Sequence, residues 1–455
     1  MENRHSGHAR WGSRFGYIMV AAGAAIGLGN IWKFPYLAYR GGGAVFLIIY
    51  IIAAIILAKP MVEMETAIGR NGRSDTVSVF EKIDKKWGFV GWISNVCTLM
   101  INFYYVVVGG WVLRYAIQFI ISGDFGTDVN AYYQNMISAP IQPIIWAGVM
   151  LVFVMILLLF GITKYVEAVS KFILPALAII LVICGIYSCV SVKGAVEGLK
   201  YYLFPDFSKL TFKVIADAIT QVLFSVGIGW GIFTTLGANV PSGNNLRKDA
   251  SLVGIADTAV AILAGFVIIP AAYGAGIDVS KGPSLVFDVM TNIFLNLPAG
   301  RFFGSLFFIA LVFAVVSSLF TFIEITVRTF EIRLKMGRKK AVIITTLIIG
   351  LGNILVSLGF GLLSNVKLPW PSFTGIEFYG FYDWFDCFSG YVLLPLGCLL
   401  ICMFTYKIWG WKKYEEQLSL NGEANDISIW KKINIVAIIP ILMLIVFLNV
   451  FGFIK

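Results

Sequence analysis

Glycine, asparagine and lysine residues lie close together in a long apolar segment near the start of the chain. Gly23, Gly27 and Gly29 are followed by Asn30 and Lys33. Each glycine costs about 1 kcal/mol relative to alanine inside a helix, so the pattern predicts a helix that breaks. Backbone can leave a helix at membrane depth only where it is buried in protein or lines a water-filled cavity. The freed carbonyl oxygens can then bind a cation, and the freed amides can bind an anion.

A second glycine-interrupted segment lies in the other half of the chain. Gly227, Gly229 and Gly231 fall at alternate positions of an apolar stretch that includes Ser225. Taken alone, either segment could be a face of small residues for close helix packing. A pair of such segments at corresponding positions of two halves is the best sequence indication of a transporter's central binding site. The pairing therefore favours a transporter.

The elements that would position these segments are membrane spans. Of the 455 residues, 59% are apolar and 13% are charged, which is typical of a polytopic membrane protein. Hydropathy predicts eleven spans, at 13–38, 42–69, 88–122, 142–160, 164–188, 212–237, 249–274, 304–335, 340–363, 383–406 and 432–453.

The distribution of positive charge predicts the orientation of these spans. Most of the 35 Lys and Arg residues fall in loops that would share one side of the membrane. The positive-inside rule makes that side, and the N-terminus, cytoplasmic. After eleven spans the C-terminus would be extracellular. The net charge of +10 fits this pattern and does not indicate a nucleic-acid partner. The six cysteines lack metal-ligand spacing, and no nucleophile–base constellation predicts an enzyme.

Three motifs, at 11–16, 27–35 and 41–46, closely resemble those of the neurotransmitter:sodium symporter family, in particular its bacterial amino-acid transporters. The resemblance extends from about residue 8 to 406. It implies an all-α inverted-repeat fold of five plus five helices, with helices 1 and 6 broken and an eleventh helix added. The implied organisation is a cytoplasmic tail (1–12), a first repeat (13–188), an extracellular loop (189–211), a second repeat (212–406), a cytoplasmic loop (407–431) and helix 11 with the C-terminus (432–455).

The resemblance implies two sodium sites, because oxygen ligands suit a hard cation. The first would use the carbonyl of Ala25 and the side chains of Asn30 and Ser225. It would also use Asp257, which falls at the family's helix-7 ligand position when the motif at 265–268 is matched. A shift of one residue would instead place Ala256 there, which has no side-chain oxygen. The second site would be formed by the carbonyls of Gly23, Ile26 and Ala314 and the hydroxyls of Ser317 and Ser318. Serine hydroxyls on a helix more often bond back to the preceding turn.

The resemblance also implies a pocket for an amino acid. The amides of Leu28 and Gly29 and the hydroxyl of Tyr105 would hold the substrate carboxylate. Gly27 stands where monoamine transporters of the family carry an aspartate, so the substrate here should bring its own carboxylate. The remaining predicted pocket residues are Ala25, Ile101, Phe224, Ser225, Gly227, Trp230 and Phe322. Gly227 replaces a common serine and should enlarge the pocket.

Two charged positions imply an outer gate, in which Lys33 would face Asp386. The family usually has arginine at the first position, and a lysine closes as a point charge without bidentate geometry. Glu65 matches the carboxylate that braces the unwound part of helix 6, whereas Glu63 matches no family role. No specific pair of residues is predicted for the inner gate, for which Arg10 and Glu331 are candidates.

The predicted function is sodium-coupled uptake of a neutral, hydrophobic L-amino acid across the cell membrane. Chloride should not be required, because Asp257 would supply the negative charge near the first sodium, and Ala261 offers no hydroxyl for chloride. Alternatives are a permease of the same fold with different ion coupling, a substrate-sensing membrane receptor and an ion channel.

Overall fold

The computed structural model describes residues 11–160, 167–274, 276, 285–370, 378–422 and 427–454. Regular structure in these ranges is almost entirely helical. Strands β1 (Lys367–Leu368) and β2 (Phe378–Tyr379) form one short antiparallel pair. The predicted all-α fold is confirmed.

Nine continuous stretches of the described residues are long and apolar enough to span a membrane, and a bent pair of helices makes a tenth. The nine are α3 (Ala44–Gly72), η2 (Lys85–Trp87) with α5 (Gly88–Ile121), α7 (Gln142–Leu159), the Ser170–Ser191 part of α8 (Glu167–Ser191), α12 (Leu246–Gly274), α14 (Gly300–Arg333), α15 (Arg338–Gly359), the series α16 (Phe381–Cys387), η6 (Phe388–Leu393), α17 (Leu394–Met403) and η7 (Phe404–Trp409), and the series α19 (Ile429–Ile433), η8 (Asn434–Ile438) and α20 (Ile439–Val450). Eleven spans as a total remains a prediction.

The bent pair is the first predicted broken helix. Helix α1 (Arg14–Ala25) is followed by a break and then by η1 (Gly29–Lys33) and α2 (Phe34–Arg40), and the two parts meet at 49°. The second predicted broken helix consists of α10 (Phe212–Val226) and α11 (Ile232–Gly237). Gly227, Gly229 and Gly231 between them have φ of +81°, +90° and +83°, a region that favours glycine. Both predicted breaks are confirmed.

Short elements connect the spans. They are α4 (Ser78–Glu81), α6 (Val129–Ser138), α9 (Ala195–Leu203), η4 (Phe207–Lys209), η5 (Leu285–Met290), α13 (Thr291–Leu295) and α18 (Trp411–Ser419).

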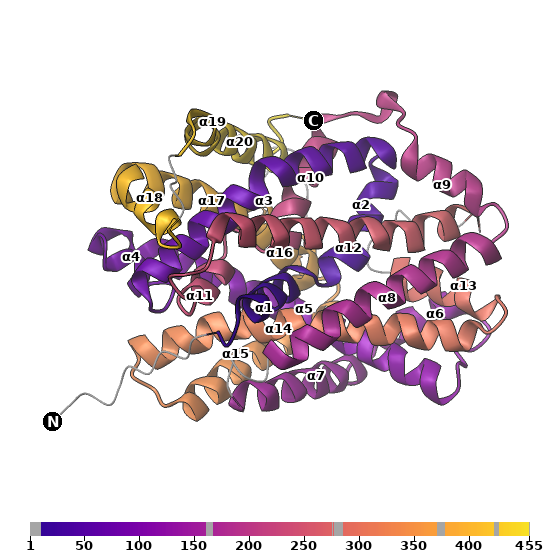
Figure 1. Cartoon of the computed structure of the whole chain (residues 1–455). Helices are drawn as coiled ribbons and strands as arrows, with labels where there is room; N and C mark the ends of the chain where they lie inside the picture. Colours follow the sequence, from indigo (N-terminus) through magenta and orange to yellow (C-terminus); the bar gives the residue numbers. More distant parts are fainter. Residues whose placement is uncertain are drawn as a thin grey trace.

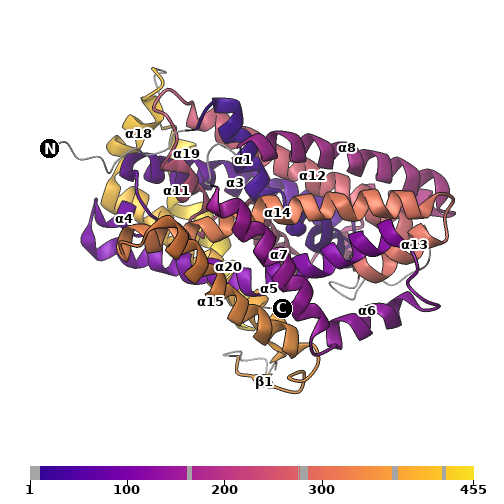
Figure 2. The ribbon, with the colours of Figure 1, turned by 90° about the horizontal axis from the view of Figure 1, so that it is seen from below.

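The broken helices lie inside the bundle. Helices α8, α12 and α14 run along the molecule, with α4 and α18 at the end where the N-terminus emerges and α9 and α13 at the opposite end (Figure 1). The view from below shows the same separation of the two ends (Figure 2). Helix α1 contacts α8, α12 and α14. The break after α1 is thereby surrounded by protein, as unpaired backbone at membrane depth requires.

Candidate functional site

A cluster of polar side chains joins the two broken helices to α12. The Asn30 side-chain amide donates to the backbone carbonyl of Asp257 (3.0 Å) and to its Oδ1 (2.7 Å). Ser225 Oγ lies 2.9 and 3.1 Å from the two carboxylate oxygens of Asp257. The hydroxyl of Tyr50, on α3, donates to Oδ2 over 3.3 Å. Three of the residues predicted for the first sodium site are thus in direct contact.

The Asp257 carboxylate is fully buried. It forms no ion pair with any residue that the structure describes. A buried ionised carboxylate is costly unless an opposite charge compensates it. With Asn30 Oδ1, which accepts a hydrogen bond from the Gly27 amide (2.9 Å), and Ala25 at the end of α1, the cluster supplies oxygen ligands suited to a hard cation.

The predicted second sodium site also comes together. Ser318 Oγ, on α14, lies 3.5 Å from the carbonyl oxygen of Gly23 and 3.4 Å from that of Ile26. Ser317 Oγ donates to the carbonyl of Ala314 over 3.0 Å within the same helix, which is the common bond back to the preceding turn. The carbonyls of Gly23 and Ile26 at the end of α1 therefore face the Ser318 hydroxyl of α14.

Gly27 lies between the second cluster and Tyr105. The amide of Leu28 donates to Tyr105 Oη over 2.8 Å, which pairs two of the three groups predicted to hold a substrate carboxylate. A Cβ on Gly27 would lie 2.4 Å from Tyr105 Oη and 2.5 Å from Ser318 Oγ. No side chain fits at this position unless both hydroxyls move.

A series of aromatic contacts begins at Tyr105. The Tyr105 and Phe322 ring centroids are 5.3 Å apart, those of Phe322 and Trp230 4.5 Å, and those of Trp230 and Phe224 6.1 Å. A Cβ on Gly29 would lie 3.0 Å from the Phe224 ring. All of these residues are buried, as is Ile101 one turn before Tyr105. The rings of Phe224, Trp230 and Phe322, all of them predicted pocket residues, form an aromatic wall beside the backbone at Gly29.

Two contacts brace the broken segments. Glu65 on α3 accepts a hydrogen bond from the amide of Gly229 at 2.6 Å, as its resemblance to the family carboxylate implied. Gln221 Nε2 donates to the carbonyl of Gly29 at 2.7 Å, which ties α10 to η1 directly. Gln221 and Tyr50 were not among the predicted site residues. Gln221, a polar side chain within an apolar span, carried a usable signal, whereas Tyr50 did not.

The ion pair that was predicted for the outer gate is present in the structure. Lys33 Nζ lies 2.8 Å from Asp386 Oδ2 and 2.9 Å from Oδ1. The same ammonium group is 4.7 Å from the centroid of the Phe224 ring, a favourable cation–π distance. Lys33 therefore joins η1, α10 and α16 above the aromatic wall.

Residues 11–14, which lead into α1, bind three other helices. Trp11 Nε1 donates to the carbonyl of Leu236 at 3.1 Å, and Arg14 Nε lies 2.7 Å from Asp249 Oδ1. Glu167, at the start of α8, accepts hydrogen bonds from the Gly12 amide and the Ser13 hydroxyl, each at 3.0 Å. These contacts link the N-terminal segment to α8, α11 and α12.

Of the two predicted candidates for the inner gate, the structure describes only Glu331. Glu331 lies 3.2 Å from Arg338, which also binds Glu324 at 2.7 Å. Arg338 follows closely in sequence and turns back on α14, so it neutralises both acids locally. Arg10 lies outside the described residues.

Glu167 offers a test of the contacts that hold residues 11–14. Burial raises the pKa of Glu167, but hydrogen bonds from Lys171, Gly12 and Ser13 outweigh it and hold the pKa below its ordinary value. The stabilisation from these hydrogen bonds is therefore present at pH 7 and is lost as the pH falls through that lowered pKa. We expect Glu167→Gln to accelerate amide hydrogen exchange at Gly12 about tenfold at pH 7, because hydrogen bonds to a charged group contribute about 1.5–3 kcal/mol.

The control is Glu197→Gln, the same change at an exposed position of α9. It should leave exchange at Gly12 unchanged. Equal exchange rates at Gly12 in Glu167→Gln and the unmodified protein would show that Glu167 does not hold the segment.

The positive φ of Gly227 changes what a substitution there would report. A Cβ would be strained by φ +81° and would lie 2.6 Å from Ile232 Cδ1. Such strain costs about 1–3 kcal/mol. We expect Gly227→Ser to lower the midpoint of thermal unfolding and to weaken binding of L-alanine and L-phenylalanine by similar factors. Gly148→Ala in α7, where a Cβ meets nothing within 4 Å, is the matched control. A selective loss of L-phenylalanine binding would instead support the predicted role as a size limit.

Comparison with known proteins agrees with this geometry. The model of the sodium:neurotransmitter symporter family matches residues 8–126 and 137–454. An uncharacterised sodium-dependent transporter of Haemophilus influenzae is 33% identical over 96% of this chain and 97% of its own length. A second one, YhdH of Bacillus subtilis, is 30% identical over 97% of this chain and 98% of its own.

A solved structure has the same fold. The crystal structure of MhsT in complex with L-phenylalanine superposes with a TM-score of 0.90 at 33% identity, covering 98% of this chain and 100% of that one. The members of this family and the two bacterial relatives are sodium-coupled membrane transporters and not enzymes. The chain belongs to the sodium:neurotransmitter symporter family.

Proposed function

We propose that this symporter couples the uptake of a neutral, hydrophobic L-amino acid to two sodium ions without chloride. The observation that carries the proposal is the Asp257 carboxylate. It is buried at the junction of both broken helices, accepts hydrogen bonds from Asn30, Ser225 and Tyr50, and has no basic partner among the described residues. A sodium ion bound beside it would supply the missing positive charge.

The second sodium would bind between α1 and α14. The carbonyls of Gly23 and Ile26 already lie within 3.5 Å of Ser318 Oγ. This site is separated from the aromatic wall by Gly27 and Tyr105, so it would stabilise the closed break without contacting the substrate side chain.

The substrate would bind by its carboxylate to the Leu28 amide and the Tyr105 hydroxyl. In this proposal the carboxylate also completes the shell of the first sodium ion, which Asn30, two residues after Leu28, would bind. The rings of Phe224, Trp230 and Phe322 offer an apolar surface to the side chain. The similar transporter MhsT was solved with L-phenylalanine, which supports an apolar substrate here.

Transport would proceed by alternate opening of the two closures. The Lys33–Asp386 pair closes one side, and the Arg14–Asp249 pair closes the other. The repeats at 13–188 and 212–406 would move relative to each other, with the N-terminus in the cytoplasm. Two sodium ions crossing 100 mV release about 4.6 kcal/mol, which can sustain a gradient of about a thousandfold for a neutral substrate.

Uptake of labelled L-phenylalanine into proteoliposomes tests this function. We expect uptake to require an inward sodium gradient and unlabelled hydrophobic amino acids to compete better than charged ones. Uptake driven equally by potassium, or competition by charged amino acids alone, would contradict the proposal.

Chloride independence is a separate prediction. Because Asp257 would provide the fixed negative charge beside the first sodium, we expect uptake in sodium gluconate to stay within about twofold of that in sodium chloride. Initial rates in the two salts at equal ionic strength measure this. A loss of uptake in gluconate would mean that a bound anion, and not Asp257, balances the sodium charge.

A further inference from the structure

A proline lies near the middle of α3, a helix that contacts α2, α10 and α11 of the two broken helices. Pro60 is buried within α3. Proline has no amide hydrogen, so position 60 cannot donate the helical hydrogen bond to the carbonyl of Ile56, four residues earlier. At membrane depth a carbonyl freed in this way needs another donor. The sequence of α3 therefore calls for a partner at Ile56.

Asn434 supplies this donor from the last apolar span. Its side-chain amide donates to the carbonyl of Ile56 over 2.9 Å. Asn434 begins η8, directly after α19, within the apolar span Ile429–Val450. Side chains of neighbouring helices can satisfy backbone groups that a proline frees in a membrane helix. Asn434 thus replaces the backbone hydrogen bond that Pro60 removes.

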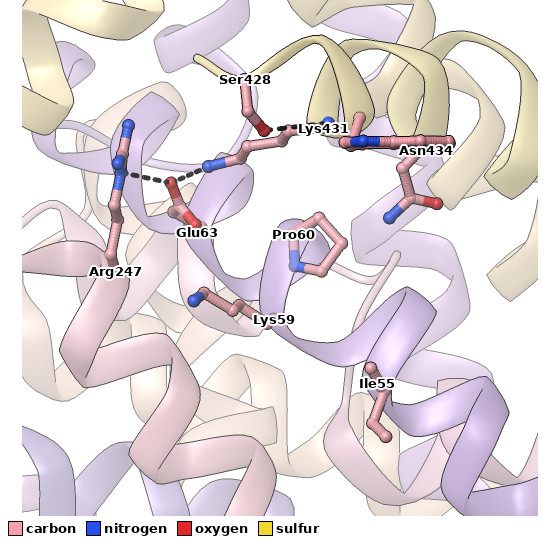
Figure 3. Close-up of a pocket in the computed structure, with 9 residues that line it drawn as sticks. Ile55, Lys59, Pro60, Glu63, Arg247, Ser428, Lys431 and Asn434 are labelled. Atoms are coloured by element: carbon pink, nitrogen blue, oxygen red, sulfur yellow. Dashed lines mark hydrogen bonds and ion pairs between the residues drawn. The ribbon is translucent and has the colours of Figure 1, made fainter. Parts of the chain in front are cut away.

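Lys431 binds α3 close to the same proline. It lies three residues before Asn434 and therefore on the same side of its helix. Its ammonium group binds the carboxylate of Glu63, three residues after Pro60. Glu63 is fully buried, and its carboxylate also lies 3.8 Å from Arg247 of α12. Figure 3 shows Lys431 and Asn434 on one helix, beside the part of α3 that carries Pro60 and Glu63.

A third contact lies near the end of α3. Arg70 Nε donates to Gln417 Oε1, on α18, over 3.3 Å. The three residues of α3 that are held in this way, Ile56, Glu63 and Arg70, are seven positions apart. They therefore lie within about 40° of one another around the helix. Helices α18 and α19 thus both bind one face of α3.

The opposite face of α3 holds the second broken helix. Glu65 is about 200° around the helix from Glu63, and it accepts the hydrogen bond from the Gly229 amide at 2.6 Å. Gly69 also faces away from α19, since a Cβ there would lie 2.1 Å from the carbonyl oxygen of Thr234 in α11. Helix α3 therefore lies between α18 and α19 on one side and the break between α10 and α11 on the other.

We propose that Asn434 and Lys431 are positioning residues for the break between α10 and α11. They fix the direction of α3 on both sides of Pro60, and α3 in turn holds Gly229 through Glu65. The last apolar span is then required for the geometry of the break as well as for the number of spans. This role goes beyond the proposed uptake and does not depend on which substrate is carried.

A double-mutant cycle on the full-length protein tests this role. The readout is hydrogen exchange of the peptide that contains Gly229, measured by mass spectrometry in detergent micelles. Asn434→Leu should raise its exchange rate about fivefold, because the Ile56 carbonyl loses its donor. In the Pro60→Ala background the new amide can bond to Ile56, so Asn434→Leu should change the rate by less than about twofold. Because α20 also contacts α10, a role in packing alone would give equal rises in both backgrounds.

Three further variants complete the test. Lys431→Met should raise exchange at Gly229 at least about fivefold, because Glu63 loses a charged partner. Lys431→Arg keeps that charge and should restore most of the protection. Asn449→Leu is the matched control, since Asn449 lies near the other end of the same span and bonds to the carbonyl of Ile454. It should leave exchange at Gly229 unchanged.

Three results would overturn the proposal. The first is an equal rise for Asn434→Leu with and without Pro60→Ala, and the second is a Lys431→Arg variant that exchanges as fast as Lys431→Met. The third is a rise in exchange of α15 equal to that at Gly229, which would show a general loss of stability. Because neither binding nor transport is measured, failure here is distinguishable from failure of the proposed amino-acid uptake.

Discussion

Asp257→Asn is expected to weaken sodium binding by at least about a hundredfold, because removal of one partner of a buried charge pair costs about 3–5 kcal/mol. The substitution keeps the shape of the side chain but removes the charge that faces Asn30 and Ser225. The measurement is the sodium concentration that gives half-maximal binding of labelled L-phenylalanine. Saturable sodium dependence should disappear at practical concentrations.

The control for this substitution is Asp217→Asn. Asp217 is a buried acid of α10 that accepts a hydrogen bond from Tyr391 and lies away from Asn30. Its change should move the sodium midpoint little. Added chloride should not rescue Asp257→Asn, because the position that would help bind chloride is the buried Ala261. A sodium midpoint in Asp257→Asn equal to that of the control would remove Asp257 from the site.

Tyr105→Phe should weaken amino-acid binding about 10- to 100-fold. The hydroxyl of Tyr105 accepts a hydrogen bond from the Leu28 amide at 2.8 Å, and it would donate one to the substrate carboxylate. A hydrogen bond to a charged group contributes about 1.5–3 kcal/mol. The ring itself, packed on Phe322, stays in place. Equilibrium binding of labelled L-phenylalanine at saturating sodium measures the loss.

The neighbouring Tyr104 gives a matched comparison. It is buried like Tyr105, but its ring packs against Tyr382, at 5.4 Å between centroids. Tyr104→Phe should bind L-phenylalanine within about threefold of the unmodified protein. Equal losses in the two variants would point to a general effect of the double tyrosine on packing of α5.

The broken helices could be predicted from single residues. A glycine lowers the stability of a helix wherever it occurs, and both predicted breaks are present in the structure. The convergence of Asn30, Ser225 and Asp257 could not be read from periodicity, because these residues lie on three different helices far apart in sequence. The common role proposed for them came from resemblance to the family, and the structure shows that their side chains are hydrogen-bonded to one another at Asp257.

Other parts of the site had no local signal. Tyr50 is one aromatic residue in an apolar helix, and its bond to Asp257 follows from how α3 packs against α12. Gly227 was also predicted to enlarge the pocket, whereas its φ of +81° shows that the backbone of the break itself favours glycine at this position. The contacts of Arg14 with Asp249 and of Glu167 with Gly12 depend on where the start of α1 lies against the other helices.

The most direct test of coupling is the affinity for L-phenylalanine measured at increasing sodium concentrations, with potassium keeping the ionic strength constant. If the substrate carboxylate completes the sodium shell beside Asp257, amino-acid affinity should rise steeply with sodium. By linkage, saturating L-phenylalanine should lower the sodium midpoint through the same coupling free energy. An L-phenylalanine affinity that is equal in sodium and in potassium would contradict this account.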